Sequence, residues 1–163
     1  MPFAAALSTH PVTAHATGEV VGQVLERLGR YPDLVLLFVT RPHVGALEDA
    51  AGTVRQLLEP SLLIGCAAES VAGNGHEVEQ APAVSLWAGV FGPVAPIRLW
   101  TAMDEAIDDE HAEHHQIEGW PSSTPFEAQA LLLLADPYSL PVDALLKGLA
   151  KRHPGLRVLG GMA

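Results

Sequence analysis

Residues 34–66 read LVLLFVTRPHVGALEDAAGTVRQLLEPSLLIGC, and their pattern predicts the fold class. The stretch opens with a continuous apolar run at 34–39, which is typical of a strand buried on both faces. A loop follows, and apolar residues then recur at helical spacing over 47–58 until Pro60 ends the helix. A second apolar run at 62–66 predicts another buried strand. The stretch is therefore a β-loop-α-β crossover, the unit that joins two parallel strands.

The same pattern returns 95 residues later without a gap, and the match predicts an internal repeat over about 34–68 and 129–163. The alternative is two independent parallel crossovers, since any two such units share part of this pattern. The aligned pairs include Pro42 with Pro137, Leu47 with Val142, Gly65 with Gly160, and Cys66 with Gly161.

The segments outside the repeat predict further strands and one more helix. Residues 3–7 are a short apolar run, and Thr17 can cap a helix that Gly29 ends. Residues 84–90 alternate as a strand does, and 97–101 predict a further strand. We therefore expect an α/β fold with a mixed sheet, in which two repeated β-loop-α-β units flank an antiparallel hairpin section and helices pack on the sheet.

The composition favours a cytoplasmic globular protein. The 163 residues are 48% hydrophobic and 17% charged, with a formal net charge of −10. This charge argues against nucleic acid and anionic membranes as partners, because both require basic patches. A single cysteine cannot form an internal disulfide, and no apolar stretch reaches the roughly 18 residues that a membrane-spanning helix needs.

An acidic, histidine-rich stretch occupies residues 104–127, which we interpret as a long solvated loop. Histidines 111, 114 and 115 could bind a divalent metal together with nearby carboxylates. The stretch lacks an HExxH motif and a second group of ligands, so we expect neither a metal site nor a cofactor.

Several short motifs follow one another along the chain: AALS at 5–8, DLVLLFV at 33–39, LIGCAAE at 63–69, GNG at 73–75, DPYSLP at 136–141 and PGLRVLGG at 154–161. In this order they resemble the N-terminal domain of the FIST family (F-box and intracellular signal transduction proteins), C-terminally incomplete. The resemblance covers most of the chain. Its most specific part is the GCxxE segment with its glycine turn, combined with the DPxSxP loop.

The resemblance implies a sensory domain of intracellular signal transduction that binds a small ligand, with amino acids or related metabolites as the usual suggestion. It implies no catalytic residues. The partners would be the small molecule itself and either the missing C-terminal FIST domain or a signalling protein.

Candidate ligand-binding residues lie where the repeated strands end, because open α/β sheets bind ligands at that edge. Arg41 and Asp136 occupy equivalent positions and could hold the carboxylate and the ammonium group of an amino acid. Alternatively, the two residues pair with each other, or Asp136 only caps its own loop. The full set of candidates is Thr40, Arg41, His43, Gly65, Cys66, Glu69, Asp136, Tyr138, Gly160 and Gly161.

Two other functions remain open. Cys66 could be the nucleophile of an acyl-transfer or hydrolytic enzyme, with His43 or His76 as its base. A small buried cysteine is the simpler interpretation, and the glycine at the equivalent position 161 favours it. Alternatively, the chain is a protein-interaction domain whose open sheet edge recruits another chain, including a second copy, by strand addition.

Overall fold

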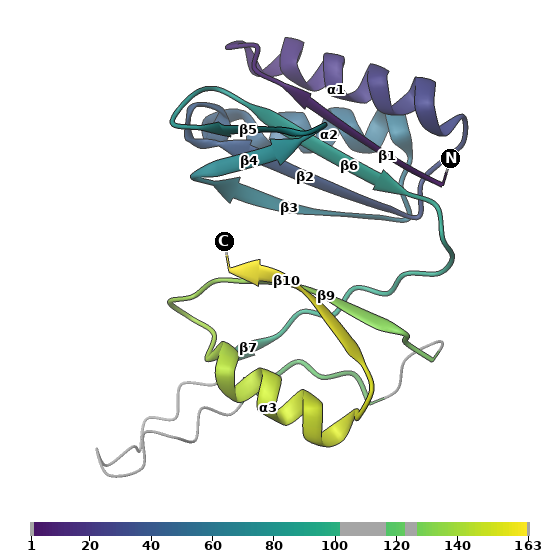
Figure 1. Cartoon of the computed structure of the whole chain (residues 1–163), viewed down its shortest axis with the longest axis vertical. Coiled ribbons are helices and arrows are strands. Elements are labelled where there is room, and N and C mark those ends of the chain that lie inside the picture. Colours follow the sequence, from purple (N-terminus) through teal and green to yellow (C-terminus); the bar gives the residue numbers. More distant parts are fainter. Residues whose placement is uncertain (1, 102–116, 123–126, 163) are drawn as a thin grey trace. The chain divides into compact units, whose positions relative to one another are not determined.

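The structure is a computed structural model that describes residues 2–101, 117–122 and 127–162. It forms two compact units, Met1–Val94 and Ala95–Ala163 (Figure 1). The expectations for histidines 111, 114 and 115 fall outside the described residues. None of the helices in the described ranges is long and apolar enough to cross a membrane.

The first unit is built on a four-stranded mixed sheet with the strand order β1-β6-β2-β3. Strands β2 (Leu34–Thr40) and β3 (Leu62–Ala68) pair in parallel, as predicted. Strand β6 (Val84–Gly89) lies antiparallel between β1 (Phe3–Ser8) and β2. Strands β1, β2 and β3 therefore share one direction, and their carboxyl ends meet at the edge of the sheet where β6 begins.

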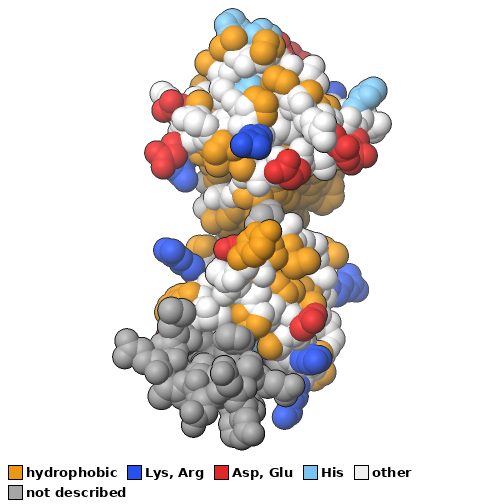
Figure 2. Space-filling model, turned by 90° about the vertical axis from the view of Figure 1, so that its left-hand side faces the viewer, with side chains coloured by type: hydrophobic (Ala, Val, Ile, Leu, Met, Phe, Trp, Pro, Cys, Tyr) orange, Lys and Arg blue, Asp and Glu red, His pale blue; other side chains and the backbone are white. Residues whose placement is uncertain are grey.

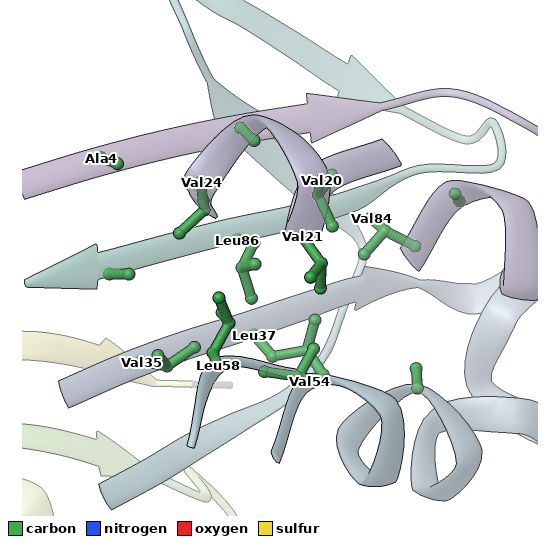
Figure 3. Close-up of a cluster of buried hydrophobic side chains, with 14 of the residues drawn as sticks. Ala4, Val20, Val21, Val24, Val35, Leu37, Val54, Leu58, Val84 and Leu86 are labelled. Carbon is green, nitrogen blue, oxygen red and sulfur yellow. The ribbon is translucent and has the colours of Figure 1, made fainter. Parts of the chain in front are cut away.

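Two helices cover one face of this sheet, α1 (Thr13–Leu28) and α2 (Leu47–Leu58) (Figure 1). Both present an apolar stripe to the strands, and the side chains interlock in a single core (Figure 3). Full burial of each such valine or leucine stabilises the fold by about 1.5–3 kcal/mol relative to exposure. The largest core side chains are Val20, Val21, Val24, Val35, Leu37, Val39, Val54, Leu58, Val84 and Leu86.

The start of α1 differs from the prediction. The helix begins at Thr13, with Val12 as its N-cap, so Thr17 is not the cap but a buried residue of the second turn. The sequence favoured Thr17 because threonine is a good capping residue and valine is a poor one. The end of the helix is confirmed, since Gly29 adopts the left-handed conformation with φ 63° and its N–H bonds the carbonyl of Leu25.

The glycine turn is confirmed as the tip of a β-hairpin between β4 (Ser70–Gly73) and β5 (His76–Glu79). Asn74 and Gly75 have φ of 52° and 79°, as a two-residue hairpin turn with right-handed twist requires. The hairpin is tied to the sheet by Ser85, whose hydroxyl donates to the carbonyl of Ala72 at 2.7 Å.

The second unit contains the other crossover, β9 (Ala130–Ala135), α3 (Val142–Arg152) and β10 (Arg157–Met162). Strands β9 and β10 pair in parallel in a sheet of their own. The strand expected at 97–101 is only Trp100–Thr101 (β7), which pairs antiparallel with Ile117–Glu118 (β8). The antiparallel partners of β6 are therefore β1 and β2, not the segment that follows it.

One backbone feature recurs in both crossovers. A Cβ atom added to Gly65 would overlap the carbonyl oxygen of Leu37, and one added to Gly160 would overlap that of Leu133. Glycine is therefore required by the neighbouring strand at both positions. The pairing differs by one residue, because a constant offset of 95 would place Leu132, not Leu133, opposite Gly160.

Candidate functional site

Five polar side chains are buried in the described part of the chain, and all five lie toward the same edge of the first sheet. Ser8 and Thr40 end β1 and β2, and Ser85 is near the start of β6. His43 follows β2, and Thr17 lies in the second turn of the helix that follows β1. We call this region the polar edge: Ser8, His10, Thr13, His15, Thr17, Glu19, Thr40, His43 and Ser85.

Figure 2 looks onto this side of the first unit, toward which the arrowheads of β1 and β3 point in Figure 1. Pale-blue histidine side chains gather at the top of the unit in this view. The carboxyl edge of an open α/β sheet is where such folds bind ligands, because the loops there leave the sheet and expose backbone and side-chain polar groups. The polar edge is therefore the candidate site of this unit.

Thr40 is held on both sides by the backbone of the loop that leads into β6. Its hydroxyl donates to the carbonyl of Ala81 at 2.7 Å and accepts from the N–H of Ala83 at 2.8 Å. A buried hydroxyl with a donor and an acceptor satisfied in this way is well stabilised. Thr40 thus joins the end of β2 to the loop before β6 through hydrogen bonds inside the protein.

His43 is the most deeply buried ionisable group of the polar edge, with 1% of its surface exposed. It lies in a short 3₁₀ helix, η1 (Arg41–Ala46), where the sequence predicted a loop and where Pro42 fits the first turn. Its Nδ1 lies 2.8 Å from Thr13 Oγ1 and shares a hydrogen bond with it, whereas the buried Nε2 has no hydrogen-bond partner among the described residues.

The environment of His43 keeps its imidazole neutral. Burial lowers the pKa of the ring most strongly, because desolvation disfavours the charged form. The backbone of His10 acts against this lowering, and the nearby charge of the His10 ring adds to it. His43 is therefore a neutral hydrogen-bonding group at ordinary pH, not a cation.

The loop between β1 and α1 supplies the other half of the polar edge. Ser8 Oγ donates to Glu19 Oε2 at 2.5 Å and accepts from the N–H of His10 at 3.2 Å. The N–H of Val12 in turn donates to His10 Nδ1 at 3.0 Å, and the His10 ring stacks on His15 with 4.8 Å between centroids. These contacts hold the loop in one conformation beside His43.

Sequence reasoning missed the residues of this loop. The signal was the segment STHPVTAH at 8–15, in which hydroxyl and imidazole side chains crowd together directly after a strand. With a helix predicted from Thr17, the sequence gives no reason to place these side chains at a strand–helix junction.

The remaining predicted residues of the first unit lie along the ends of β2 and β3. Arg41 is exposed at the start of η1, and Glu69 is exposed directly after β3. Gly65 is exposed within β3, and its glycine requirement comes from the carbonyl of Leu37. The structure thus brings Thr40, Arg41 and His43 to one edge, and a ligand contact for each stays a prediction.

Cys66 is half-buried in β3 as a free thiol. Burial raises the pKa of this thiol, so it forms less thiolate than an ordinary cysteine. Activation of a nucleophile requires the opposite shift. His43 is one of the two histidines considered as the base for Cys66. Its Nδ1 is not available for this role, because it shares a hydrogen bond with Thr13.

In the second unit, the DPYS loop is closed by its own aspartate. Asp136 Oδ1 accepts from the N–H of Tyr138 at 2.9 Å, and Oδ2 accepts from Ser139 Oγ at 2.8 Å. These two bonds lower the pKa of the Asp136 carboxyl. Such an arrangement is the loop-capping role considered for Asp136. Tyr138 is 97% exposed, and Gly160 and Gly161 are exposed in β10.

Arg41 and Asp136 belong to different units, so their joint recognition of one ligand stays a prediction.

Comparison with known proteins identifies the family. The model of the FIST N domain matches residues 33–163 of this chain. The chain belongs to the FIST family. An uncharacterized protein of Mycobacterium tuberculosis strain H37Rv is 30% identical over 168 residues, which cover 99% of this chain and 40% of that protein. An uncharacterized protein of Mycobacterium bovis is 29% identical with the same coverage.

The FIST chain thus spans about two fifths of the length of the relatives it matches. The family match begins at residue 33, which places the β1–α1 half of the polar edge before it. The mycobacterial relatives, however, match across nearly all of this chain.

Proposed function

We propose that this FIST domain is a sensory module of intracellular signal transduction that binds a small ligand at the polar edge. The ligand is an amino acid or a related metabolite, and the domain acts in the cytoplasm. Ligand binding would be communicated to the remainder of a longer FIST protein or to a signalling partner.

The observation that carries this proposal is the concentration of all five buried polar side chains of the described residues at one edge of one sheet. Burial of a polar group costs free energy unless it is hydrogen-bonded, and Ser8, Thr40 and Ser85 are bonded inside the protein. The other two side chains each keep a buried atom that has no hydrogen-bond partner among the described residues, Thr17 Oγ1 and His43 Nε2. Such unpartnered groups are expected where a ligand or an ordered water completes the bonding.

The chemistry of the polar edge suits a small polar molecule. Its groups are hydroxyls, imidazoles and one carboxylate, so both donors and acceptors lie along one edge of the sheet. A zwitterion such as an amino acid offers both an acceptor and a donor to such a network. In addition, Arg41 is exposed on η1, beside the buried His43.

The test is a thermal-shift screen of the 163-residue chain with amino acids and short carboxylic acids, followed by ¹⁵N NMR titration of each compound that raises the melting temperature. Ligand that binds only the folded state stabilises it by mass action. Binding compounds should shift the amides of residues 8–19 and 40–46. The variant His43→Asn should weaken binding, and His76→Asn, in the exposed hairpin, is the matched control.

Two results would contradict the proposal. One is that no compound of the panel stabilises the chain. The other is that a binding compound shifts amides elsewhere and leaves the polar edge unchanged.

A second candidate function is strand-mediated association. Strand β10 is a terminal strand of its sheet among the described residues, and Leu159 and Met162 on it are 63% and 66% exposed. An open, apolar strand edge is a template for pairing with another chain, here a second copy. Light scattering should then show a dimer that the variant Leu159→Lys disrupts. A monomer at high concentration would exclude this association.

A cysteine-dependent activity has no comparable support, because burial raises the pKa of the Cys66 thiol. We therefore expect iodoacetamide to alkylate Cys66 slowly in the folded chain, at a rate below that of a free thiol in a peptide. Alkylation faster than that of the peptide thiol would instead support a cysteine-dependent enzyme.

A further inference from the structure

We propose that the outer edge of β9 is an interaction surface that binds a further strand in the antiparallel direction, supplied by the remainder of a longer FIST protein. The outer edge is the side of β9 opposite β10. This surface is separate from the polar edge, and the inference does not rest on ligand binding there. It also differs from the free edge of β10, which is the edge considered above for association of two copies.

Strand β9 has the sequence of a central strand and the position of an edge strand. Its six residues read ALLLLA, a continuous apolar run. Such a run is typical of a strand that has neighbours on both sides and is covered on both faces. Among the described residues, however, only β10 pairs with β9. The sequence of β9 therefore fits a wider sheet than the pair in which it lies.

The first crossover shows what occupies the corresponding side. Strand β2 pairs in parallel with β3 on one side and antiparallel with β6 on the other. Crossovers between parallel strands have one hand, so the outer side of β9 corresponds to the side of β2 on which β6 lies. We therefore expect the strand that binds β9 to run antiparallel to it, as β6 does to β2.

The burial of the two strands differs in the same sense. Val35, Leu37 and Val39 of β2 are 0%, 1% and 0% exposed. The four leucines of β9, at 131–134, are only partly buried. A two-stranded sheet is marginally stable, and three or more strands with an apolar face are needed for independent stability. A third strand beside β9 would remove more of this leucine surface from water and stabilise the second unit.

The outer strand of the first sheet is protected against such pairing, whereas β9 carries no comparable protection in its own sequence. Strand β1 ends the first sheet, and the guanidinium of Arg27 donates to the carbonyl of Ala5 on it. Charged side chains and prolines at an edge strand prevent pairing with another chain. Strand β9 contains neither a charged residue nor a proline. Its edge is therefore suited to pairing.

The proposed strand belongs to the same polypeptide and not to a second copy. This chain spans about two fifths of the length of its mycobacterial relatives, which leaves a long segment of those proteins in which such a strand can lie. In the first unit, β6 likewise comes from the same chain, after the crossover that it flanks. A strand in the same polypeptide binds at a high effective concentration, which a separate molecule does not have.

The test is a graft that supplies such a strand. Ala68 ends β3, and the offset of 95 residues between the crossovers places Ala163 at the corresponding position. A copy of residues 69–91, which contain the hairpin and β6, is appended after Ala163. Hydrogen exchange of the β9 amides is then measured by NMR in the parent and the grafted chain. The alternate amides directed away from β10 should exchange about tenfold more slowly in the grafted chain, because a bonded amide exchanges only after the strand opens.

The matched control is the same graft with two prolines in its copy of β6, Ser85→Pro and Trp87→Pro, made in the graft alone. In the first sheet these residues lie opposite Phe38 and Leu36 of β2. Proline has no N–H to donate to the ladder, so this graft should leave the exchange of β9 as it is in the parent chain. Residues 1–163 are unchanged in both grafted chains, so a difference between them reports pairing and not damage to the parent fold.

Three results would overturn the inference. The outer amides of β9 could already exchange slowly in the dilute parent chain, which would mean that residues 1–163 occupy this edge themselves. Slow exchange could appear only at high protein concentration, together with a dimer in light scattering, and the occupant would then be a second copy. Finally, the two grafts could give the same exchange rates for β9, which would mean that no strand pairs there.

Discussion

The crossover from β2 to β3 and the crossover from β9 to β10 share a backbone scaffold and differ in the loop it carries. In both, a strand leads into a helix, and the second strand presses a glycine against a carbonyl of the first. The loop after β2 buries His43 and bonds it to Thr13 in another segment. The loop after β9 instead exposes Tyr138 and bonds Asp136 to residues two and three positions later.

This difference shows which residues are constrained by the packing of the two strands and which are not. Close approach of two strands dictates glycine in both crossovers, whatever the unit does. The loops are free of this constraint, and loops on a rigid scaffold are where binding residues are usually placed. Only the first loop is joined to a buried polar network in the described residues, so we place the ligand there. Four measurements test this contrast between the two loops.

The largest effect should come from the shared glycines. Gly65→Ala would drive a methyl group into the carbonyl of Leu37 and should lower the free energy of unfolding by about 3 kcal/mol. Gly160→Ala should destabilise the second unit in the same way. Hydrogen exchange of the β2 and β9 amides reports each unit separately.

The controls for this prediction are the helical glycines Gly52 in α2 and Gly148 in α3, where an added Cβ meets nothing within 4 Å. Their replacement by alanine should stabilise by up to about 1 kcal/mol, because alanine is the better helix former. If Gly65→Ala behaves like Gly52→Ala, the shared scaffold is wrong.

Thr40 should give the next largest effect. It ends β2, and the strand β9 ends in Ala135, so only the first crossover has a hydroxyl here. Thr40→Val leaves the N–H of Ala83 and the carbonyl of Ala81 without their partner and should cost about 1–3 kcal/mol. Urea unfolding measures this cost, and Thr53→Val, whose hydroxyl is near the surface, should cost less. Equal costs would mean that the network around Thr40 adds nothing.

A smaller effect should appear in the pH dependence of stability. The pKa of His43 is lower in the folded than in the unfolded chain, so the unfolded state binds the proton first as the pH falls. Stability should therefore be constant above about pH 6.5 and decline below it. The variant His43→Leu should lose this part of the decline in thermal melts, and His76→Asn should keep it. An unchanged profile in His43→Leu would show that His43 is not buried in its neutral form.

The smallest effect belongs to the loop of the second unit. Ser139→Ala removes one of the two bonds that lower the pKa of Asp136, so that pKa should rise toward its ordinary value. Because the folded pKa is the lower one, the small stabilisation from Asp136 is present above about pH 3.9 and is lost as the pH falls further. A ¹³C NMR titration of the carboxyl group measures the shift. Tyr138→Phe should leave it unchanged, because Tyr138 donates through its backbone N–H.

Much of the scaffold was predictable from the sequence. Apolar runs at 34–39, 62–66 and 131–134 identified parallel strands, and helical spacing identified α2 and α3, because burial imposes period and length on any strand or helix. The Asn74–Gly75 turn and the Gly29 terminus were also predictable, since both need positive φ.

The start of α1 and the partners of β6 were not predictable by the same means. Val12 is a poor N-cap by propensity, and only the contacts of Ser8, His10 and His43 make the chain turn there. Strand β6 alternates as any antiparallel strand does, and this pattern carries no information on which strands flank it.

The amino-acid sequence alone was sufficient to predict the α/β class, the two crossovers and the turn at Asn74–Gly75. These features depend on local periodicity and on backbone conformation, which each segment carries on its own. The glycines Gly65 and Gly160, in contrast, are required by a carbonyl of the neighbouring strand. Which polar residues meet depends instead on the tertiary structure. Ser8, Thr13 and His43 lie up to 35 positions apart in the chain and come to a common edge because β6 sits between β1 and β2, which brings the loops after β1 and β2 together.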